Sequence, residues 1–263
     1  MSADAGAHSV EAMERQLEAE FLGETLDVMN GLDVLLENIR SHQATPTEAL
    51  ASMRRAYVNL EARAQAVDQP LIRMVCHRAA EYVFDLRAPE ERHFADLQSF
   101  IDRIRQIVDG GAGGVSDAAP QLARELPSRS AADFDIKDIV QRNVEAMLVI
   151  PDRAMGRLIE RELMACGYRV SNARTPFRAL EIAVRAQPDF IIISAVLDEL
   201  SGIDLANALV AMPATHKLPT AILTSYGWGH PSLDDLPVRV AILRKGPEFG
   251  GDLAEFLARF RIT

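Results

Sequence analysis

Ser194 is the residue whose position in this sequence most directly suggests chemistry. It is the last residue of the segment 188–194. The four apolar residues before it, 190–193, have the composition of a strand buried on both faces. A polar loop and a helical pattern from Ile203 follow. In open parallel sheets, ligands bind at the carboxyl ends of such strands. A serine hydroxyl is a weak nucleophile without an adjacent base, and the sequence shows no base near Ser194.

The other reactive residue types are scattered and make no metal-binding or catalytic spacing. His77 lies in an expected helix, where its imidazole either accepts a phosphoryl group or is partly buried and paired with Glu81. Cys76 and Cys166 fall in separate halves, and we expect two buried, reduced thiols. We therefore predict no catalytic residue, no metal site and no cofactor.

Composition and charge restrict the class of protein further. The chain of 263 residues is long enough for two domains, and its apolar fraction of 48% is ordinary for a globular protein. We expect no secretory signal and no membrane span, and a cytoplasmic location. The net charge is −10, and residues 1–125 contribute −9 of it, with 21 acidic and 12 basic side chains. This acidic half argues against nucleic acid as a partner and leaves room for a basic protein.

The first half shows only helical patterns. Apolar residues recur at helical spacing in four segments, which begin near Ser9, Thr45, Asp68 and Ala88. Four amphipathic helices with short connections predict an antiparallel bundle over residues 1–109. The alternative is a helical hairpin that completes a bundle by dimerising. A flexible linker, rich in Gly, Ala, Ser and Pro, is expected over residues 110–135.

From residue 145 onward, strand patterns alternate with helical patterns. Strands are expected at residues 146–150, 168–171, 190–193, 220–223 and 240–243, and helices at 155–166, 176–186, 203–212 and 252–261. This order predicts a second domain, residues 136–263, introduced by a short helix over residues 135–145. Its core would be a five-stranded parallel, doubly wound sheet. Residues 225–237 hold two glycines and two prolines, which predicts a shortened or missing fourth helix.

Over about residues 144–262, this second half resembles the receiver domain of two-component response regulators. The resemblance is carried by the order of the elements and by the positions of four strand ends, which hold Pro151 and Asp152, Ser194, Thr224, and Lys245. It implies the receiver fold and a role in two-component signalling. In that family, the corresponding carboxylates hold Mg²⁺ and one aspartate accepts the phosphoryl group.

The departures from the family pattern concern the reacting groups. Pro151 stands where the first acidic residue is expected, and Ser194 stands in place of the phosphorylated aspartate. A proline offers Mg²⁺ no side-chain ligand, and a serine cannot form the reactive acyl phosphate. The hypothesis is therefore a pseudo-receiver. Thr224 and Lys245 match the family, and they either form a residual anion pocket with Asp152 or make hydrogen bonds that hold the strand ends.

The first half has a weaker resemblance to histidine phosphotransfer (HPt) domains, which are helical bundles that partner receivers. The best local match is residues 54–64, where Val58 occupies the histidine position. That helix has no histidine and no lysine, so the resemblance implies a degenerate HPt-like bundle. Tyr226 and Trp228 lie among glycines, either exposed for recognition or in a turn anchored by one buried ring.

Together these features predict a non-enzymatic signalling adaptor. Its partners would be proteins of a two-component pathway, such as a histidine kinase, an HPt protein or a receiver, and a homodimer would use the N-terminal bundle. One alternative is an active phosphorelay protein that uses His77. The other is an acidic regulator that sequesters a basic partner such as a transcription factor.

Overall fold

The computed structural model describes residues 2–84, 86–110, 119–129 and 142–262. The chain divides into two compact units: Met1–Ala119 with Glu125–Pro127, and Pro120–Arg124 with Ser128–Thr263. Among the helices of these described ranges, none has both the length and the apolarity needed to cross a bilayer. Each unit is described separately below.

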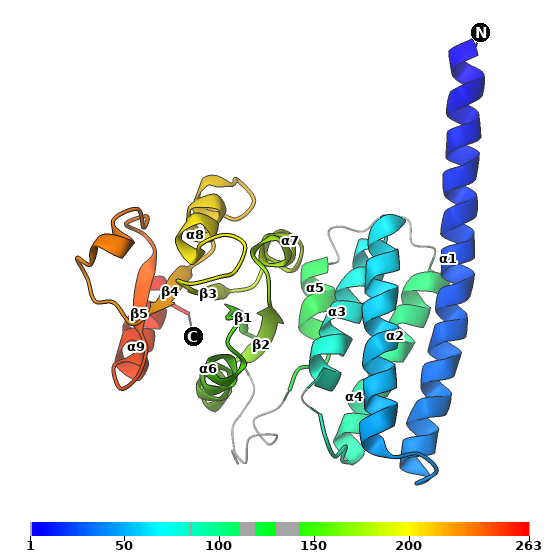
Figure 1. Cartoon of the computed structure of the whole chain (residues 1–263), viewed down its shortest axis with the longest axis horizontal. Helices are drawn as coiled ribbons and strands as arrows, with labels where there is room; N and C mark the ends of the chain where they lie inside the picture. The colour runs from blue at the N-terminus through cyan, green and yellow to red at the C-terminus, as the bar shows by residue number, and fades with distance from the viewer. Residues whose placement is uncertain (1, 85, 111–118, 130–141, 263) are drawn as a thin grey trace. The chain divides into compact units, whose positions relative to one another are not determined.

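The first unit is a ring of four helices (Figure 1). They are α1 (Ser2–Arg40), α2 (Pro46–Ala66), α3 (Pro70–Phe84) and α4 (Glu91–Asp109). Helix α1 packs on both α2 and α4, and α3 also packs on both. The bundle is therefore completed within one chain, as expected, and not by dimerisation of a hairpin. In Figure 1 the N-terminal part of α1 extends beyond the ends of the other three helices.

Local chemistry accounts for the start of α2. Pro46 occupies the first helical position, where its fixed φ suits the helix and its missing N–H costs nothing. The residues Thr45-Pro-Thr-Glu48 match a capping-box signature, but that box does not form: the Thr45 hydroxyl donates to the Glu48 carboxylate at 2.9 Å, and no backbone N–H bonds to the hydroxyl. The helix then buries an apolar stripe of Leu50, Met53, Tyr57, Leu60 and Ala64.

Tyr57 carries a polar group in this otherwise apolar stripe. Its side chain is fully buried and its hydroxyl has no hydrogen-bond partner. Burial, reinforced by the nearby Cys76 and Asp33, raises the pKa of Tyr57 far above its ordinary value, so the phenol stays neutral. A buried, unpaired hydroxyl costs about 1–3 kcal/mol of stability.

We therefore expect Tyr57→Phe to raise the free energy of unfolding by about 1 kcal/mol, because it removes the unpaired group and keeps the ring. Urea denaturation of the full chain measures the change. A loss of stability in the Phe variant would contradict this account of the hydroxyl.

The second unit is a parallel sheet between two helical layers. Its strands are β1 (Glu145–Val149), β2 (Arg169–Ala173), β3 (Phe190–Ser194), β4 (Thr220–Thr224) and β5 (Ala241–Arg244). They lie in the order β2-β1-β3-β4-β5 and all pair in parallel. This is the flavodoxin-like doubly wound order, in which ligands bind outside the carboxyl ends of the strands. The predicted fold class is thus confirmed.

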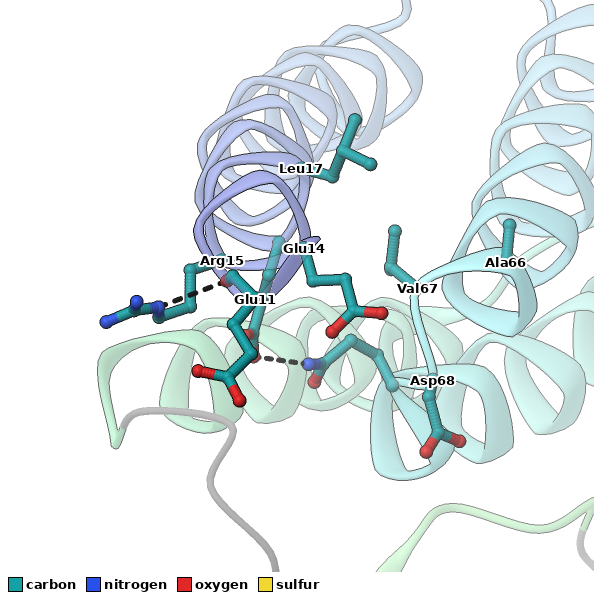
Figure 2. Close-up of a pocket in the computed structure, with 9 residues that line it drawn as sticks. Glu11, Glu14, Arg15, Leu17, Ala66, Val67 and Asp68 are labelled. Atoms are coloured by element: carbon teal, nitrogen blue, oxygen red, sulfur yellow. Dashed lines mark hydrogen bonds between the residues drawn. The ribbon is translucent and has the colours of Figure 1, made fainter. Parts of the chain in front are cut away.

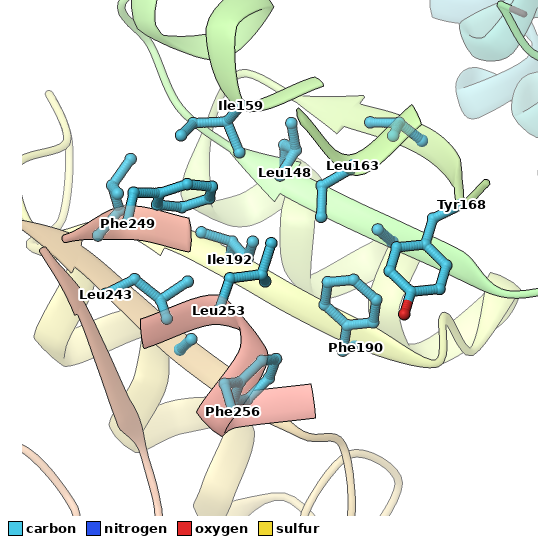
Figure 3. Packing of buried hydrophobic residues seen from close by; sticks show 14 of the residues in the cluster. Leu148, Ile159, Leu163, Tyr168, Phe190, Ile192, Leu243, Phe249, Leu253 and Phe256 are labelled. Atoms are coloured by element: carbon cyan, nitrogen blue, oxygen red, sulfur yellow. The ribbon is translucent and has the colours of Figure 1, made fainter. Parts of the chain in front are cut away.

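The helices that alternate with these strands are α6 (Arg153–Ala165), α7 (Pro176–Ala186), α8 (Gly202–Ala211) and α9 (Phe249–Phe260). Helices α6 and α9 cover one face of the sheet, where their apolar side chains meet Phe190 and Ile192 of β3 (Figure 3). Helices α7 and α8 contact each other over the opposite face. Every residue of β3 is buried, as the apolar run predicted.

The connection between β4 and β5 lacks an α-helix, as predicted. Its only helical turn is the 3-10 segment η3 (Pro231–Leu233), which begins after His230. Pro231 fits the first position of such a turn, while Gly229 adopts a left-handed φ of 80° just before it. Because these residues cannot continue an α-helix, β5 follows β4 through a loop.

The predicted linker requires a correction. A short helix, α5 (Ala119–Glu125), occupies part of residues 110–135, so the coil expected there is not continuous. The reason is visible in the sequence Ala-Pro-Gln-Leu-Ala-Arg-Glu: Pro120 suits the first turn, and the following residues are good helix formers. Residues 111–118 and 130–141 lie outside the described chain, so most of the expected 135–145 helix does too. Glu145 belongs to β1 rather than to that helix.

An ion pair joins the end of β5 to the first turn of α9. Asp252 accepts hydrogen bonds from the Arg244 guanidinium at 2.6 and 2.9 Å and from its backbone N–H at 2.8 Å. These bonds, chiefly those from the side chain, lower the pKa of Asp252 below its ordinary value. Since the folded pKa is depressed, the stabilisation is present above the unfolded pKa and is lost as pH falls through the folded pKa.

We expect Asp252→Asn to be less stable than the native chain at neutral pH, with a difference that shrinks as pH falls below about 4, the unfolded pKa of aspartate. Urea denaturation at a series of pH values from neutral to acid measures both curves. A constant difference between the two curves would show that the ionised carboxylate is not what stabilises this turn.

Candidate functional site

The predicted site residues come together at the carboxyl edge of the sheet. The register pairs Val149 with Ile193, and Ser194 with Leu223, so β1, β3 and β4 end side by side. Backbone hydrogen bonds continue this edge beyond the strands, from Ala195 N–H to the Leu223 carbonyl at 3.0 Å and from Lys245 N–H to the Thr224 carbonyl at 2.8 Å. The topology thus brings Asp152, Ser194, Thr224 and Lys245 to one edge.

Asp152 has a structural task in this arrangement. It is the N-cap of α6, and its carboxylate accepts a hydrogen bond from the Met155 backbone N–H at 2.8 Å. Such a cap satisfies an amide that the first turn of a helix leaves unpaired. Pro151, directly before it, contributes no side-chain ligand. The one carboxylate that remains of the expected acidic pair is therefore engaged with the protein's own backbone.

Ser194 is buried, with only 6% of its surface exposed. The backbone of α8 returns close against it: a Cβ added to Gly202 would lie 2.0 Å from the Ser194 carbonyl oxygen. The Gly202 N–H also donates to the Ala195 carbonyl at 3.1 Å. The loop after β3 is thus folded tightly over the strand end. Sequence reasoning placed Ser194 correctly but missed Gly202, whose only signal was a glycine at the start of a helical pattern.

Thr224 and Lys245 differ in how they are held. The Thr224 side chain is buried and its hydroxyl accepts a hydrogen bond from the Tyr226 backbone N–H at 3.1 Å. Lys245 is half-buried and directly follows β5, next to Gly246 with its left-handed φ of 96°. The Thr224 contact supports the expectation that this residue holds the strand end.

The acidic residues of the loop after Ser194 are exposed. Asp198 and Glu199 point into solvent at positions between β3 and α8. Throughout the described part of the chain, His, Cys, Asp and Glu side chains form no group of three that could hold a metal ion.

Two aromatic residues beside this edge are exposed. Tyr226 is 43% exposed and Trp228 is 72% exposed, in the loop that follows β4. The Tyr226 ring stacks on the His230 ring, with centroids 3.8 Å apart and planes within 10°. The alternative of a turn anchored by one buried ring is therefore wrong, and the loop presents its aromatic side chains to solvent.

The candidate phosphotransfer residues lie in the bundle. His77, on α3, is mostly buried, and its Nδ1 lies 3.4 Å from a carboxylate oxygen of Glu61 on α2. Sequence reasoning named Glu81 as its partner and missed Glu61, because the contact joins two helices. Val58, at the position matched to the HPt histidine, is exposed on α2. The exposed mid-helix position thus carries an aliphatic side chain.

Solved structures similar to this chain are receiver domains. The receiver domain of a Pseudomonas aeruginosa sensor histidine kinase is 20% identical, with a TM-score of 0.41, and the match covers 47% of this chain and 99% of that one. A putative response regulator from Chloroflexus aurantiacus is 21% identical (TM-score 0.40, 45% and 98% covered). A Vibrio cholerae chemotaxis response regulator is also 21% identical (TM-score 0.38, 44% and 98% covered).

No protein-family model and no curated protein matches the sequence. The similarity to solved structures concerns the C-terminal part of the chain and its fold. The assignment of that fold rests on the strand order and parallel pairing given above.

Proposed function

We propose that this protein is a non-enzymatic adaptor of two-component signalling, built from a degenerate HPt-like bundle and a receiver-like domain that does not accept phosphate. The fold supplies the signalling context through its resemblance to receivers. The site residues supply the argument against phosphoryl transfer. The function that remains is binding to proteins of such a pathway.

The observation that carries the proposal is the state of the three positions at the carboxyl edge. Pro151 offers no ligand, the Asp152 carboxylate caps α6, and a buried hydroxyl at Ser194 replaces the carboxylate that would form an acyl phosphate. In the receiver pattern, carboxylates at these positions bind Mg²⁺ and attack the phosphoryl group. The strands still end side by side, as in a receiver. The fold and its surfaces therefore remain available for binding, while the side chains that would react are replaced.

The test is the intact mass of the full chain after incubation with acetyl phosphate and Mg²⁺, and then with a phosphorylated receiver. We expect no phosphoryl adduct under either condition. A receiver with all three carboxylates, treated in parallel, shows that the reagents are active. A stoichiometric adduct on this chain would overturn the proposal.

Two variants identify the source of any adduct. Loss of labelling in His77→Gln would restore the alternative of an active phosphorelay protein, since His77 is the one histidine we singled out. Loss of labelling in Ser194→Ala would show that the hydroxyl at the end of β3 reacts. Under the adaptor proposal, both variants give the same unlabelled mass as the native chain, apart from the substitution.

A further inference from the structure

The N-terminal extension of α1 leaves an apolar stripe without a partner inside the unit. Phe21 is buried against the bundle, and Met13 and Leu17 continue its row at intervals of four residues. Residues four apart lie on the same side of a helix. Met13 is 60% exposed and Leu17 is 50% exposed, so this part of the stripe is open to solvent.

This stripe borders a groove between α1 and the turn that joins α2 to α3. The groove has a volume of about 790 Å³, and Figure 2 shows Leu17 facing Val67 and Ala66 across it. The α2–α3 turn is held in place by Gln69, which is buried and donates to the Glu18 carboxylate at 2.7 Å. Apolar side chains of α1 and of this turn therefore face each other across the groove, and a hydrogen bond fixes the turn to α1.

The rim of the groove is acidic. Carboxylates of Glu11, Glu14 and Asp68 stand around it, and Arg15 is its one basic side chain (Figure 2). The Arg15 guanidinium donates to the Glu11 main-chain carbonyl at 3.1 Å, so this bond does not use a rim carboxylate. Facing apolar side chains within a negative rim are complementary to a ligand that has apolar side chains flanked by positive ones.

A second copy of this chain does not fit that description. Residues 11–20 of α1 carry four acidic side chains and one basic one. Two such segments placed together would set carboxylates against carboxylates, and like charges in contact are unfavourable. The charge of the groove thus distinguishes between the possible occupants of the apolar stripe.

We propose that this groove is a docking site for a basic amphipathic helix of a partner protein. Residues 11–20 extend about 15 Å, which matches roughly three turns of a bound helix. Apolar residues of the partner at i and i+4 would cover Leu17 and Val67, while flanking Lys or Arg residues pair with the rim. The inference deepens the proposed adaptor function, because it names the surface and the partner chemistry. The docking site and the proposed function can be disproved independently, because a phosphoryl adduct would contradict the adaptor function without altering this groove.

The test uses a fluorescent synthetic peptide with leucines at i, i+4 and i+8 and lysines elsewhere, titrated with the full chain and followed by anisotropy. We expect saturable binding that weakens as salt is added, because salt screens the rim charges. Leu17→Asp and the double variant Glu11→Lys/Glu14→Lys should each weaken binding about tenfold or more. A peptide of the same composition with scrambled order should bind more weakly.

The matched control is Asp27→Lys/Glu37→Lys, which makes the same change in net charge at two exposed positions of α1 outside the groove. This variant should stay within about twofold of the native affinity. Equal weakening by both double variants would mean unspecific attraction to an acidic protein, and absence of saturable binding would mean no site; either overturns the proposal. The proposal would also be overturned if sedimentation showed that the native chain forms a dimer and that Leu17→Asp dissociates this dimer.

Discussion

Gly202→Ala should destabilise the second unit by on the order of 3 kcal/mol or more. The added methyl would lie 2.0 Å from the Ser194 carbonyl oxygen and 2.9 Å from its carbonyl carbon, far inside any allowed contact. Both atoms belong to the backbone of β3, which the sheet holds on both sides, so no flexible side chain can move away. The strand end and the first turn of α8 would have to separate.

Gly250→Ala is the matched control for this substitution. Gly250 lies near the start of α9, and a Cβ added there would meet nothing within 4 Å. Alanine is preferred to glycine in an exposed helix, so this variant should gain up to about 1 kcal/mol. Urea denaturation of the full chain, with hydrogen exchange measured on peptides of the second unit, separates the two results. Equal stability of the two variants would show that the close approach at Gly202 is absent in solution.

Phe190→Ala should cost about 3–5 kcal/mol, the usual range for truncating a fully buried phenylalanine. The Phe190 ring belongs to the buried cluster drawn in Figure 3 and has no exposed surface. It packs edge-to-face against Tyr168 and Phe256, with centroids 5.7 Å away in both cases. The substitution removes both aromatic contacts and leaves a cavity between β3 and α9.

Phe177→Ala provides the same chemical change at the surface. Phe177 lies on α7 and is 65% exposed, so its truncation should alter the free energy of unfolding by less than about 0.5 kcal/mol. Denaturant curves of the two variants, compared with the native chain, measure the difference. Similar losses for Phe190 and Phe177 would contradict the packing of β3 described here.

The sequence predicted the regular elements well where local signals agree. Helix α7 covers Pro176–Ala186, as expected, because Thr175 caps its start and Pro176 fits the first position. The strands are displaced by no more than two residues from their expected ends, and β1, β3, β4 and β5 each contain a short apolar run beside polar residues. The missing helix before β5 was predictable because glycine and proline act locally.

Three of the missed features depend on contacts between separate elements. Helix α5 was hidden by a composition typical of linkers, and Cys166, expected to be buried, is exposed at the end of α6. The Glu61–His77 pair, the groove beside Leu17 and the close approach at Gly202 each join two elements. Periodicity shows which face of a helix is apolar, but it does not show whether a neighbouring helix is long enough to cover that face.

The order of the two units along the chain has a consequence for how the protein is made. Among the described helices of the bundle, each helix packs on the next one in sequence, and the α1–α4 contact closes a long loop. In the sheet, β1 must pair with β3, whose sequence is made only after β2 and α7. Folds rich in local contacts form faster than those that depend on distant strand pairing. As the chain leaves the ribosome, the bundle can therefore fold first, while the apolar strands that follow remain exposed until β3 has emerged.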